Sequence, residues 1–174
     1  MESNKKTFRY KLILFGNIAV GKTSLVERFI HDRFNETYIT TLGYNVFEKQ
    51  IVHDNNILSL MIYDIGGQEK FRELREKYAN GADMAFIIYD VTDRNSFNAV
   101  PDWKKDLFEF AGEIPFIIIG NKIDLEHKIP EGDAMKLSYE INALDFFETS
   151  AKTGQGVENA FNLLAIKTYE SMSK

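Results

Sequence analysis

The chain has 174 residues and a net charge of −5, and 44% of its residues are hydrophobic and 27% charged. This length and composition fit one soluble globular domain. The lack of cysteine excludes disulfides, thiol catalysis and cysteine-ligated metals, and the three histidines have no metal-ligand spacing. No basic cluster predicts a nucleic-acid partner, no apolar run is long enough to cross a membrane, and no signal-peptide core follows Met1, so we expect a cytoplasmic protein.

Lipid anchors are not expected at either end of the sequence. Glu2 follows the initiator where myristoylation requires glycine, and prenylation requires a cysteine, which the chain lacks. We therefore expect no intrinsic membrane anchor in this sequence. Residues 1–7 are expected to be a flexible N-terminus within a single domain that occupies residues 1–174.

The first predicted element is a buried strand that ends in a phosphate-binding loop. The apolar run Leu12–Phe15 predicts the strand, Gly16–Thr23 has the pattern Gly-x-x-x-x-Gly-Lys-Thr, and apolar residues from Leu25 to Ile30 recur at helical spacing. Glycines let the backbone approach phosphate oxygens, the first helical turn presents free N–H groups, the lysine can reach the outer phosphates, and the threonine hydroxyl can bind magnesium. A plain glycine turn is the weaker alternative, because strand, turn and helix occur in the required order. The predicted phosphate-binding residues here are Gly16, Asn17, Ile18, Ala19, Val20, Gly21, Lys22, Thr23 and Ser24.

Residues 34–43, after this helix, are expected to form a loop that reaches the nucleotide. Phe34 could cover the base or ribose, and the Thr41 hydroxyl could complete the magnesium shell when a third phosphate is present. Taken alone, such residues are more often a core aromatic and an ordinary loop threonine. Both assignments therefore depend on the remainder of the site.

The remaining elements predict an α/β fold. Strands near Tyr44–Val52 and Ile57–Ile65 flank the turn-forming cluster Asp54-Asn55-Asn56, which predicts an antiparallel hairpin. Further apolar strands alternate with helical patterns, and this alternation predicts a mainly parallel sheet with helices on both faces. Together with the phosphate-binding loop and the hairpin, it leads us to expect a P-loop NTPase fold with a six-stranded sheet in which one strand is antiparallel. Ligands bind such sheets at the carboxyl ends of the strands. The strands are Met84–Tyr89, Ile114–Ile119 and Asp145–Phe147, and the helices are Phe97–Phe110, Gly132–Ile141 and Val157–Tyr169.

The segment Asp64–Glu69, which closes the third strand, carries groups for phosphate hydrolysis. Asp64 can hold a magnesium-bound water, and the Gly67 N–H can approach a terminal phosphate. The Gln68 amide both donates and accepts, so it can orient an attacking water and is the predicted catalytic residue. By itself the segment fits a polar turn equally well. After a phosphate-binding loop, it favours hydrolysis.

Two later segments, each after a strand, predict guanine as the base. The Asp124 carboxylate can accept hydrogen bonds from N1–H and the exocyclic amine of guanine, whereas adenine would leave it unpaired. The Lys122 stem can lie along the base, and amides near Ala151 can bond O6. Either segment alone is weak, because each also fits a charged or capping loop. The predicted base- and ribose-binding residues are Phe34, Asn121, Lys122, Asp124, Ser150, Ala151 and Lys152.

With these segments in order, the chain resembles the Ras superfamily of small GTPases over essentially its whole length. Residues 38–43 (Tyr-Ile-Thr-Thr-Leu-Gly), 68–72 (Gln-Glu-Lys-Phe-Arg) and 148–152 (Glu-Thr-Ser-Ala-Lys) resemble the Rab branch. Residues 64–68 (Asp-Ile-Gly-Gly-Gln) and 42–46 (Leu-Gly-Tyr-Asn-Val) are closer to the Arf branch, and the former also to heterotrimeric α subunits. The chain is therefore Rab-like overall, with Arf-like features in its switch regions.

The resemblance implies a switch between GDP and GTP that works with magnesium. With GTP bound, Thr41 and the Gly67 amide contact the γ-phosphate and order two switch loops, and hydrolysis releases them. The reaction is slow until an activating protein supplies an arginine, which adds roughly 10³–10⁵-fold; in this chain Arg33 and Arg72 are candidates only by proximity. The implied partners are an exchange factor, an activating protein and effectors of a monomeric protein in membrane trafficking or signalling. The implied switch and effector residues are Tyr38, Ile39, Thr40, Leu42, Gly43, Tyr44, Tyr63, Phe71, Leu74 and Tyr78.

Several positions depart from the family pattern and leave alternatives open. Ile18 stands where the family has a small residue, and its bulk would crowd Gln68 and an incoming arginine. A guanine-nucleotide-binding interaction module with little hydrolysis is therefore the alternative function. Val46 and Tyr63 replace the Phe and Trp that Rab effectors contact, so partner identity does not carry over. An ATP-using kinase or ATPase would require Asp124 to tolerate adenine.

Overall fold

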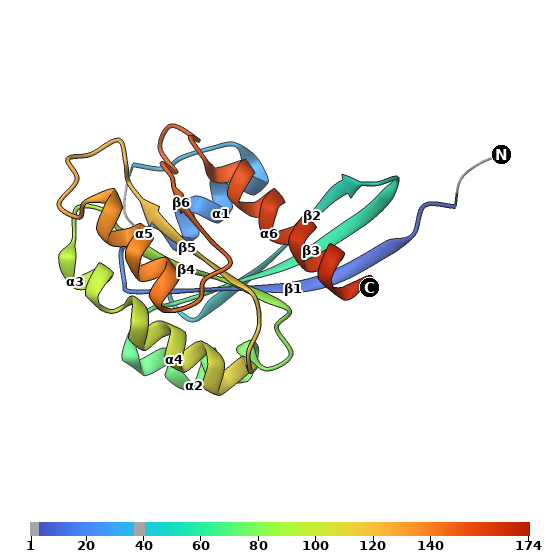
Figure 1. Ribbon diagram of the computed structural model, residues 1–174, viewed down its shortest axis with the longest axis horizontal. Coiled ribbons are helices and arrows are strands. Elements are labelled where there is room, and N and C mark those ends of the chain that lie inside the picture. Colours follow the sequence, from blue (N-terminus) through green and yellow to red (C-terminus); the bar gives the residue numbers. More distant parts are fainter. Residues whose placement is uncertain (1–3, 37–40) are drawn as a thin grey trace.

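The computed structural model describes residues 4–36 and 41–174, with the elements shown in Figure 1. None of the helices in these two ranges has the length and apolarity that crossing a bilayer requires. In chain order the elements are β1 (Thr7–Gly16), α1 (Lys22–His31), β2 (Tyr44–His53), β3 (Asn56–Ile65), the short 3-10 turn η1 (Glu69–Phe71), α2 (Arg72–Ala79), β4 (Met84–Asp90), α3 (Arg94–Asn98), α4 (Val100–Ala111), β5 (Phe116–Asn121), α5 (Glu131–Glu140), β6 (Asp145–Glu148) and α6 (Val157–Met172).

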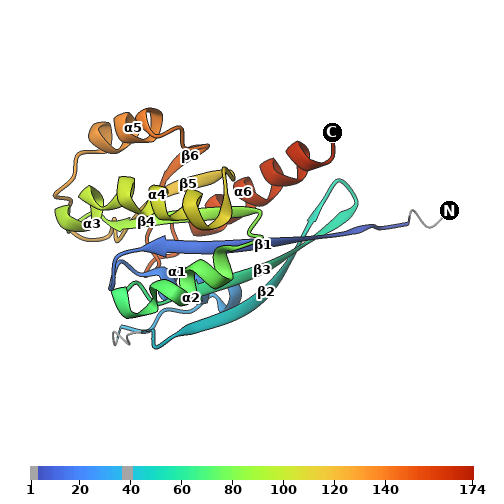
Figure 2. The same ribbon diagram turned by 90° about the horizontal axis from the view of Figure 1, so that it is seen from below.

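The strands form one six-stranded sheet in the order β2-β3-β1-β4-β5-β6, which Figure 2 shows from one edge to the other. Strand β2 is antiparallel to β3, and the other neighbouring pairs are parallel. The predicted P-loop NTPase fold is confirmed. Because β1 lies in the middle of the sheet, the loop that leaves its carboxyl end can be reached from both halves of the molecule.

Two apolar clusters, one on each face of the sheet, hold the layers together. Along β1 the side chains alternate: Leu12 and Leu14 belong to the cluster under α1 and α6, whereas Ile13 and Phe15 belong to the cluster under α2, α3, α4 and α5. Both sets are buried, so β1 reads as a continuous apolar run, as expected of a strand covered on both faces. Helices α1 and α6 meet through stacked Phe rings 4.1 Å apart.

The predicted hairpin is present, with a tight turn at its tip. Asp54 and Asn55 have φ values of 48° and 63°, and they connect β2 and β3 with His53 opposite Asn56. Two consecutive left-handed residues form the turn type that matches the twist of a hairpin, and Asp and Asn tolerate this conformation.

The helix predicted over Phe97–Phe110 is wrong as a single element, since the structure has two helices, α3 and α4. Pro101 lies in the first turn of α4. Proline has no N–H to donate to the preceding turn, so α3 cannot continue unbroken into α4. Asp93 starts α3 by accepting a 3.0 Å hydrogen bond from the Asn95 amide.

Helix α2 was not predicted, because its buried side is not apolar. Its sequence is Arg-Glu-Leu-Arg-Glu-Lys-Tyr-Ala, and its buried residues are Arg75 and Ala79. Amphipathic helices are recognised by an apolar stripe, and here an arginine occupies the stripe.

The strands also extend beyond their predicted cores. The Lys6 amide donates to the Asn56 side chain at 3.2 Å, and the Lys6 carbonyl accepts from the Ile57 amide at 2.8 Å. A flexible N-terminus was expected over residues 1–7, but Thr7 already belongs to β1; residues 1–3 lie outside the described ranges. Strand β5 begins after Pro115 rather than before it.

Candidate functional site

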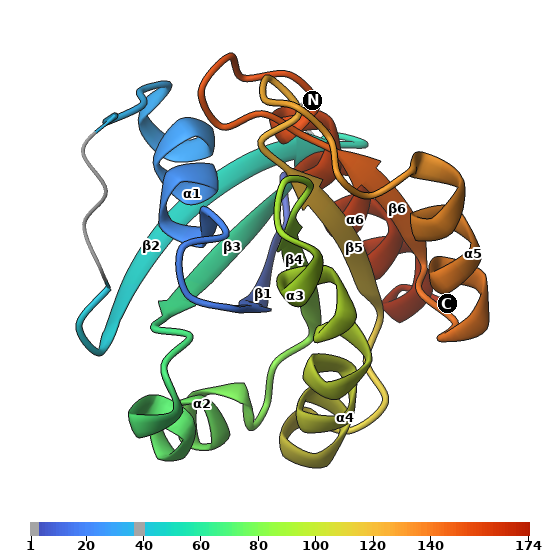
Figure 3. The same ribbon diagram turned by 90° about the vertical axis from the view of Figure 1, so that its left-hand side faces the viewer.

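A cavity of about 870 Å³ opens at the carboxyl ends of the parallel strands, the end of the molecule that faces the viewer in Figure 3. It is within the size range of small-molecule sites. All four predicted segments reach it, although they are far apart in the sequence. The predicted residues that line it are Ile18, Ala19, Gly21, Lys22, Thr23, Ser24, Phe34, Thr41, Leu42, Gly67, Gln68, Asn121, Lys122, Asp124, Ala151 and Lys152.

The loop between β1 and α1 is shaped by two glycines that no other residue could replace without a clash. Gly21, with a φ of 98°, precedes the first residue of α1. A Cβ on Gly16 would collide with the Ile88 carbonyl, and a Cβ on Gly21 would collide with the side-chain amide of Asn121. The loop can therefore wrap closely around a ligand at the amino end of α1, where free N–H groups favour an anion.

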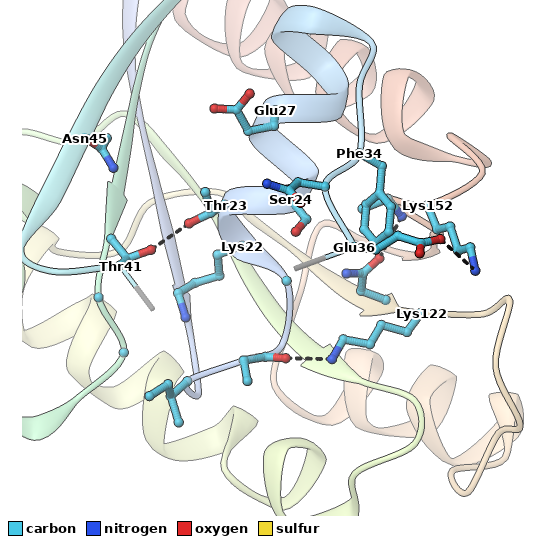
Figure 4. A pocket seen from close by; sticks show the side chains of 18 of the residues that line it. Lys22, Thr23, Ser24, Glu27, Phe34, Glu36, Thr41, Asn45, Lys122 and Lys152 are labelled. Carbon is cyan, nitrogen blue, oxygen red and sulfur yellow. Dashed lines mark hydrogen bonds and ion pairs between the residues drawn. The ribbon is translucent and has the colours of Figure 1, made fainter. Parts of the chain in front are cut away.

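Lys22, the first residue of α1, is a buried cation that lines the cavity, and Figure 4 shows its side chain within the curve of this loop. Its Nζ donates to the carbonyls of Gly16 and Asn17, each at 2.8 Å. Burial lowers the pKa of Lys22 to about 8, and the charge of Asp64 offsets this in part. A bound phosphate would raise that pKa again, so the site favours an anionic ligand.

Three oxygen-bearing side chains meet beside Lys22. The Thr23 hydroxyl lies 2.7 Å from the Thr41 hydroxyl, as Figure 4 shows, and donates to Asp64 Oδ2 at 2.5 Å. Asp64 is fully buried, burial raises its pKa, and its Oδ1 has no hydrogen-bond partner among the described residues. A buried carboxylate oxygen without a partner beside two hydroxyls fits a cation that prefers oxygen ligands, such as magnesium.

The end of β3 approaches the phosphate-binding loop at Gly67. A Cβ on Gly67 would lie 2.5 Å from the Gly16 carbonyl oxygen and 2.9 Å from the Ile18 amide nitrogen. The Gly66 amide donates to the Gly43 carbonyl at 2.9 Å, which joins this segment to the start of β2. Gln68 and Ile18 both line the cavity, and Ile18 is 46% exposed.

Asn121 joins three segments beneath the predicted base site. Its side-chain Nδ2 donates to the Val20 carbonyl at 3.0 Å, while its Oδ1 accepts from the Thr149 hydroxyl at 3.0 Å and the Ala151 amide at 3.3 Å. Asn121 is buried at the border of the cavity, and its side chain is engaged by Val20, Thr149 and Ala151. It thus fixes the phosphate-binding loop relative to the last predicted segment.

The carboxylate predicted to recognise guanine is oriented by its neighbour. Ser150, which does not line the cavity, donates from its hydroxyl to Asp124 Oδ1 at 2.7 Å. Lys122 has a φ of 70° and donates from Nζ to the Ala19 carbonyl at 2.7 Å, an interaction drawn in Figure 4. Across the cavity mouth, Lys152 forms a 3.7 Å ion pair with Glu36.

The sequence reasoning missed two residues that hold groups of this site, Asp90 and Arg28, and it did not single out the cavity-lining residues Glu27, Asn35, Glu36, Asn45 and Leu125. Asp90 pairs with Lys122 Nζ at 2.8 Å; its position at the carboxyl end of β4 was an available signal. Arg28 on α1 donates to the carbonyls of Ala151 at 2.8 Å and Lys152 at 2.5 Å. No sequence pattern predicts that an arginine will bond to main-chain carbonyls more than 100 residues away along the chain.

The predicted effector surface is only partly described, because Tyr38, Ile39 and Thr40 lie outside the described ranges. The rings of Tyr44 and Tyr63 lie 4.3 and 5.6 Å from that of Tyr78. Leu42 and Tyr44 are exposed. Gly43 holds the Gly66 amide, and Phe71 and Leu74 pack against the core.

Neither Arg33 nor Arg72 is placed to supply the catalytic arginine from within this chain. Arg72 turns toward α4, where it pairs with Asp106 at 3.0 Å, and it does not line the cavity. Arg33 lines the cavity and pairs with Glu27 at 2.8 Å.

Nearly the whole chain is similar to known proteins. The model of the Ras family matches residues 11–170. Ras-related protein Rab-7b of Bos taurus is 39% identical over 166 residues, which cover 92% of this chain and 82% of that protein. GTP-binding protein YPT1 of Saccharomyces cerevisiae is 38% identical over 169 residues, 96% of this chain and 82% of its own. Ypt/Rab-type GTPase avaA of Emericella nidulans is 34% identical over 171 residues, 94% of this chain and 83% of its own.

Proposed function

This chain belongs to the Ras family of small GTPases, and we propose that the cavity at the carboxyl end of its sheet is where it binds and hydrolyses GTP. It is a Rab-like, GTP-binding molecular switch and a GTP-hydrolysing enzyme. The observation that carries the proposed location is the meeting of four separate segments around a buried lysine at the amino end of α1.

The phosphates bind at the loop Gly16–Thr23. Its main-chain amides and the amino end of α1 surround the phosphate oxygens, and the buried Lys22 contributes a positive charge. Asn17 and Val20, which do not line the cavity, shape the loop from behind. Their carbonyls are held from within the protein, that of Val20 by Asn121 and that of Asn17 by Lys22, which supports this structural role.

Magnesium fits among Thr23, Thr41 and Asp64. The two hydroxyls lie next to each other, and the unpartnered Oδ1 of Asp64 is available to hold the ion, directly or through a water. Bound there, magnesium would neutralise charge that develops on the phosphates during transfer. Thr41 reaches this position from the loop between α1 and β2 rather than from α1, and we expect it to contact the ion when a third phosphate is bound.

Hydrolysis is assigned to Gln68 and the Gly67 amide. Gln68 orients a water for in-line attack on the γ-phosphorus, the bond to the bridging oxygen breaks, and GDP and phosphate remain. The Gly67 amide would donate to the γ-phosphate, and the close approach of Gly67 to the phosphate-binding loop supports this. Because no arginine of the described chain is clearly aimed at the phosphates, an activating protein is the expected source of one.

Guanine is recognised by Asp124, held in place by Ser150. Adenine would leave this carboxylate without its two donors, which disfavours the ATP-using alternative. Phe34 and Lys122 border the base or ribose. Ala151 lines the cavity too, but its amide donates to Asn121 Oδ1 at 3.3 Å, so a bond to O6 of the base would have to share that N–H. Competition between GDP and ADP tests the assignment: at least a hundredfold preference for GDP is expected, and equal affinities would overturn it.

The alternative of a module that scarcely hydrolyses GTP is not favoured. The chain matches proteins named as GTPases, and it retains Gln68, Thr41 and Asp64. Single-turnover hydrolysis should be magnesium-dependent and should fall sharply in Gln68→Ala, while Ile18→Gly tests whether the branched side chain slows the reaction. Equal rates in wild type and Gln68→Ala would contradict the role of Gln68. We expect an exchange factor, an activating protein and effectors as partners, and membrane trafficking as the setting.

A further inference from the structure

A buried arginine, Arg75, connects the proposed catalytic segment to the body of the protein. Arg75 is 1% exposed, and its Nη1 donates to the Gly66 carbonyl at 3.0 Å and to the Gln68 carbonyl at 2.7 Å. These two carbonyls stand on either side of Gly67. Burying a guanidinium is unfavourable unless it is bonded, so its bonds to this segment are the main compensation that the described residues offer.

Other partners of Arg75 are weak or apolar. The Glu69 carboxylate lies 3.9 Å from Nη2 of Arg75 and is 84% exposed, so water screens the pair. The Nε atom has no hydrogen-bond partner among the described residues. Arg75 is therefore held chiefly by main-chain carbonyls and by the aromatic ring below it.

That ring is Trp103 of α4, which reaches the phosphate-binding loop. The Arg75 guanidinium carbon lies 4.9 Å from the centre of the Trp103 ring, within cation–π range. The indole N–H of Trp103 donates to the side-chain oxygen of Asn17 at 2.7 Å. A contiguous path thus runs from Asn17 through Trp103 and Arg75 to the main chain around Gly67.

We propose that Arg75 is a positioning residue for GTP hydrolysis, and that Trp103 couples it to the phosphate-binding loop. Arg75 acts through the carbonyls of Gly66 and Gln68, which set where the Gly67 amide and the Gln68 side chain lie. The inference rests on the proposed catalytic role of Gln68. Since Asn17 lies in the loop that holds the phosphates, a change of nucleotide at that loop reaches the catalytic segment through α4 as well as directly.

The chain offers a matched control one turn earlier on the same helix. Arg72 also joins α2 to α4, through a 3.0 Å ion pair with Asp106 and a position 5.0 Å above the Phe110 ring. Within the described ranges, the Arg72 side chain bonds to Asp106 and Glu109 of α4 and not to residues 66–68. Removing its charge therefore removes an α2–α4 link of the same kind without touching the catalytic segment.

The test compares Arg75→Met and Arg72→Met with wild type in single-turnover GTP hydrolysis, GDP affinity and thermal unfolding. We expect hydrolysis to slow about tenfold in Arg75→Met and less than about twofold in Arg72→Met, because only Arg75 bonds to the catalytic segment. GDP affinity should change less than about twofold in both, since GDP has no γ-phosphate for that segment to contact. Equal hydrolysis in wild type and Arg75→Met would overturn the positioning role, whereas no hydrolysis in wild type would instead overturn the proposed function.

The fluorescence of Trp103 provides a second readout, and it can be assigned to this residue because Trp103 is the one tryptophan in the sequence. A response of this fluorescence to the nucleotide is not expected from a purely structural role of Arg75. Its fluorescence should change when a non-hydrolysable GTP analogue replaces GDP, and this change should be lost in Arg75→Met and kept in Arg72→Met. Should Arg75→Met fail to fold, Trp103→Phe keeps an aromatic ring but removes the bond to Asn17. Reduced hydrolysis in Trp103→Phe would support the coupling. Unchanged hydrolysis in this variant would contradict it, and so would wild-type fluorescence that is the same with GDP and with the GTP analogue.

Discussion

Replacing Asn121 with alanine should destabilise the protein more than any exposed asparagine does. Asn121 is 1% exposed, and its amide satisfies the Val20 carbonyl, the Thr149 hydroxyl and the Ala151 amide. Alanine removes three hydrogen bonds and leaves three buried polar groups without their partner. Each unsatisfied group costs about 1–3 kcal/mol, and partial relaxation makes about 3–5 kcal/mol the expected total.

The assay is urea unfolding at several GDP concentrations. Bound nucleotide stabilises the folded state by mass action, so the dependence on GDP separates lost affinity from lost intrinsic stability. The control is Asn98→Ala, an exposed residue of α3, which should change the free energy of unfolding by less than about 0.5 kcal/mol. Equal unfolding free energies for the two variants would refute the idea that Asn121 holds the loops together.

Ser150→Ala should weaken GDP binding by about tenfold, because Asp124 loses the hydroxyl that orients it; unchanged release of a fluorescent GDP would contradict this. GDP affinity should fall as pH rises above about 8, since burial puts the pKa of Lys22 at about 8 and the phosphates bind its protonated form; a wild-type profile as flat as that of Lys22→Met would argue against it. In the nucleotide-free protein the same lowered pKa has the opposite effect: the unfolded chain binds more protons, so stability should rise from pH 8 toward 10.5, as acid–base titration of unfolding would show. Asp64→Asn should reduce the magnesium dependence of GDP affinity; a chelator that still accelerates GDP release as strongly as in wild type would exclude Asp64 from the site.

The strands and the loops that follow them could be predicted because their signals are local. Gly16–Thr23 and Asp54-Asn55 combine a steric requirement with a short pattern, and both act as predicted in shaping the backbone. The parallel sheet then brings strand ends together by topology, so segments as distant as Lys22 and Asp124 reach one cavity. That inference needed only the order of the segments along the chain and the apolar character of the strands before them.

The rest depended on partners that only the folded chain supplies. The sequence analysis did not single out Arg75, because its burial depends on the carbonyls of Gly66 and Gln68 and on the ring of Trp103, which only the folded chain brings around it. Helix α2 was missed because an arginine, rather than an apolar residue, lies on its buried side. The break before α4 follows from Pro101, a local signal that the apolar pattern over Phe97–Phe110 outweighed.

The most direct test of the central claim is the nucleotide that remains bound to the purified protein, measured together with its magnesium-dependent turnover. Guanine nucleotide, predominantly GDP, and slow hydrolysis of added GTP that depends on Gln68 are the predicted result. Bound adenine nucleotide, or GTP turnover that is the same with and without the Gln68 amide, would contradict the account.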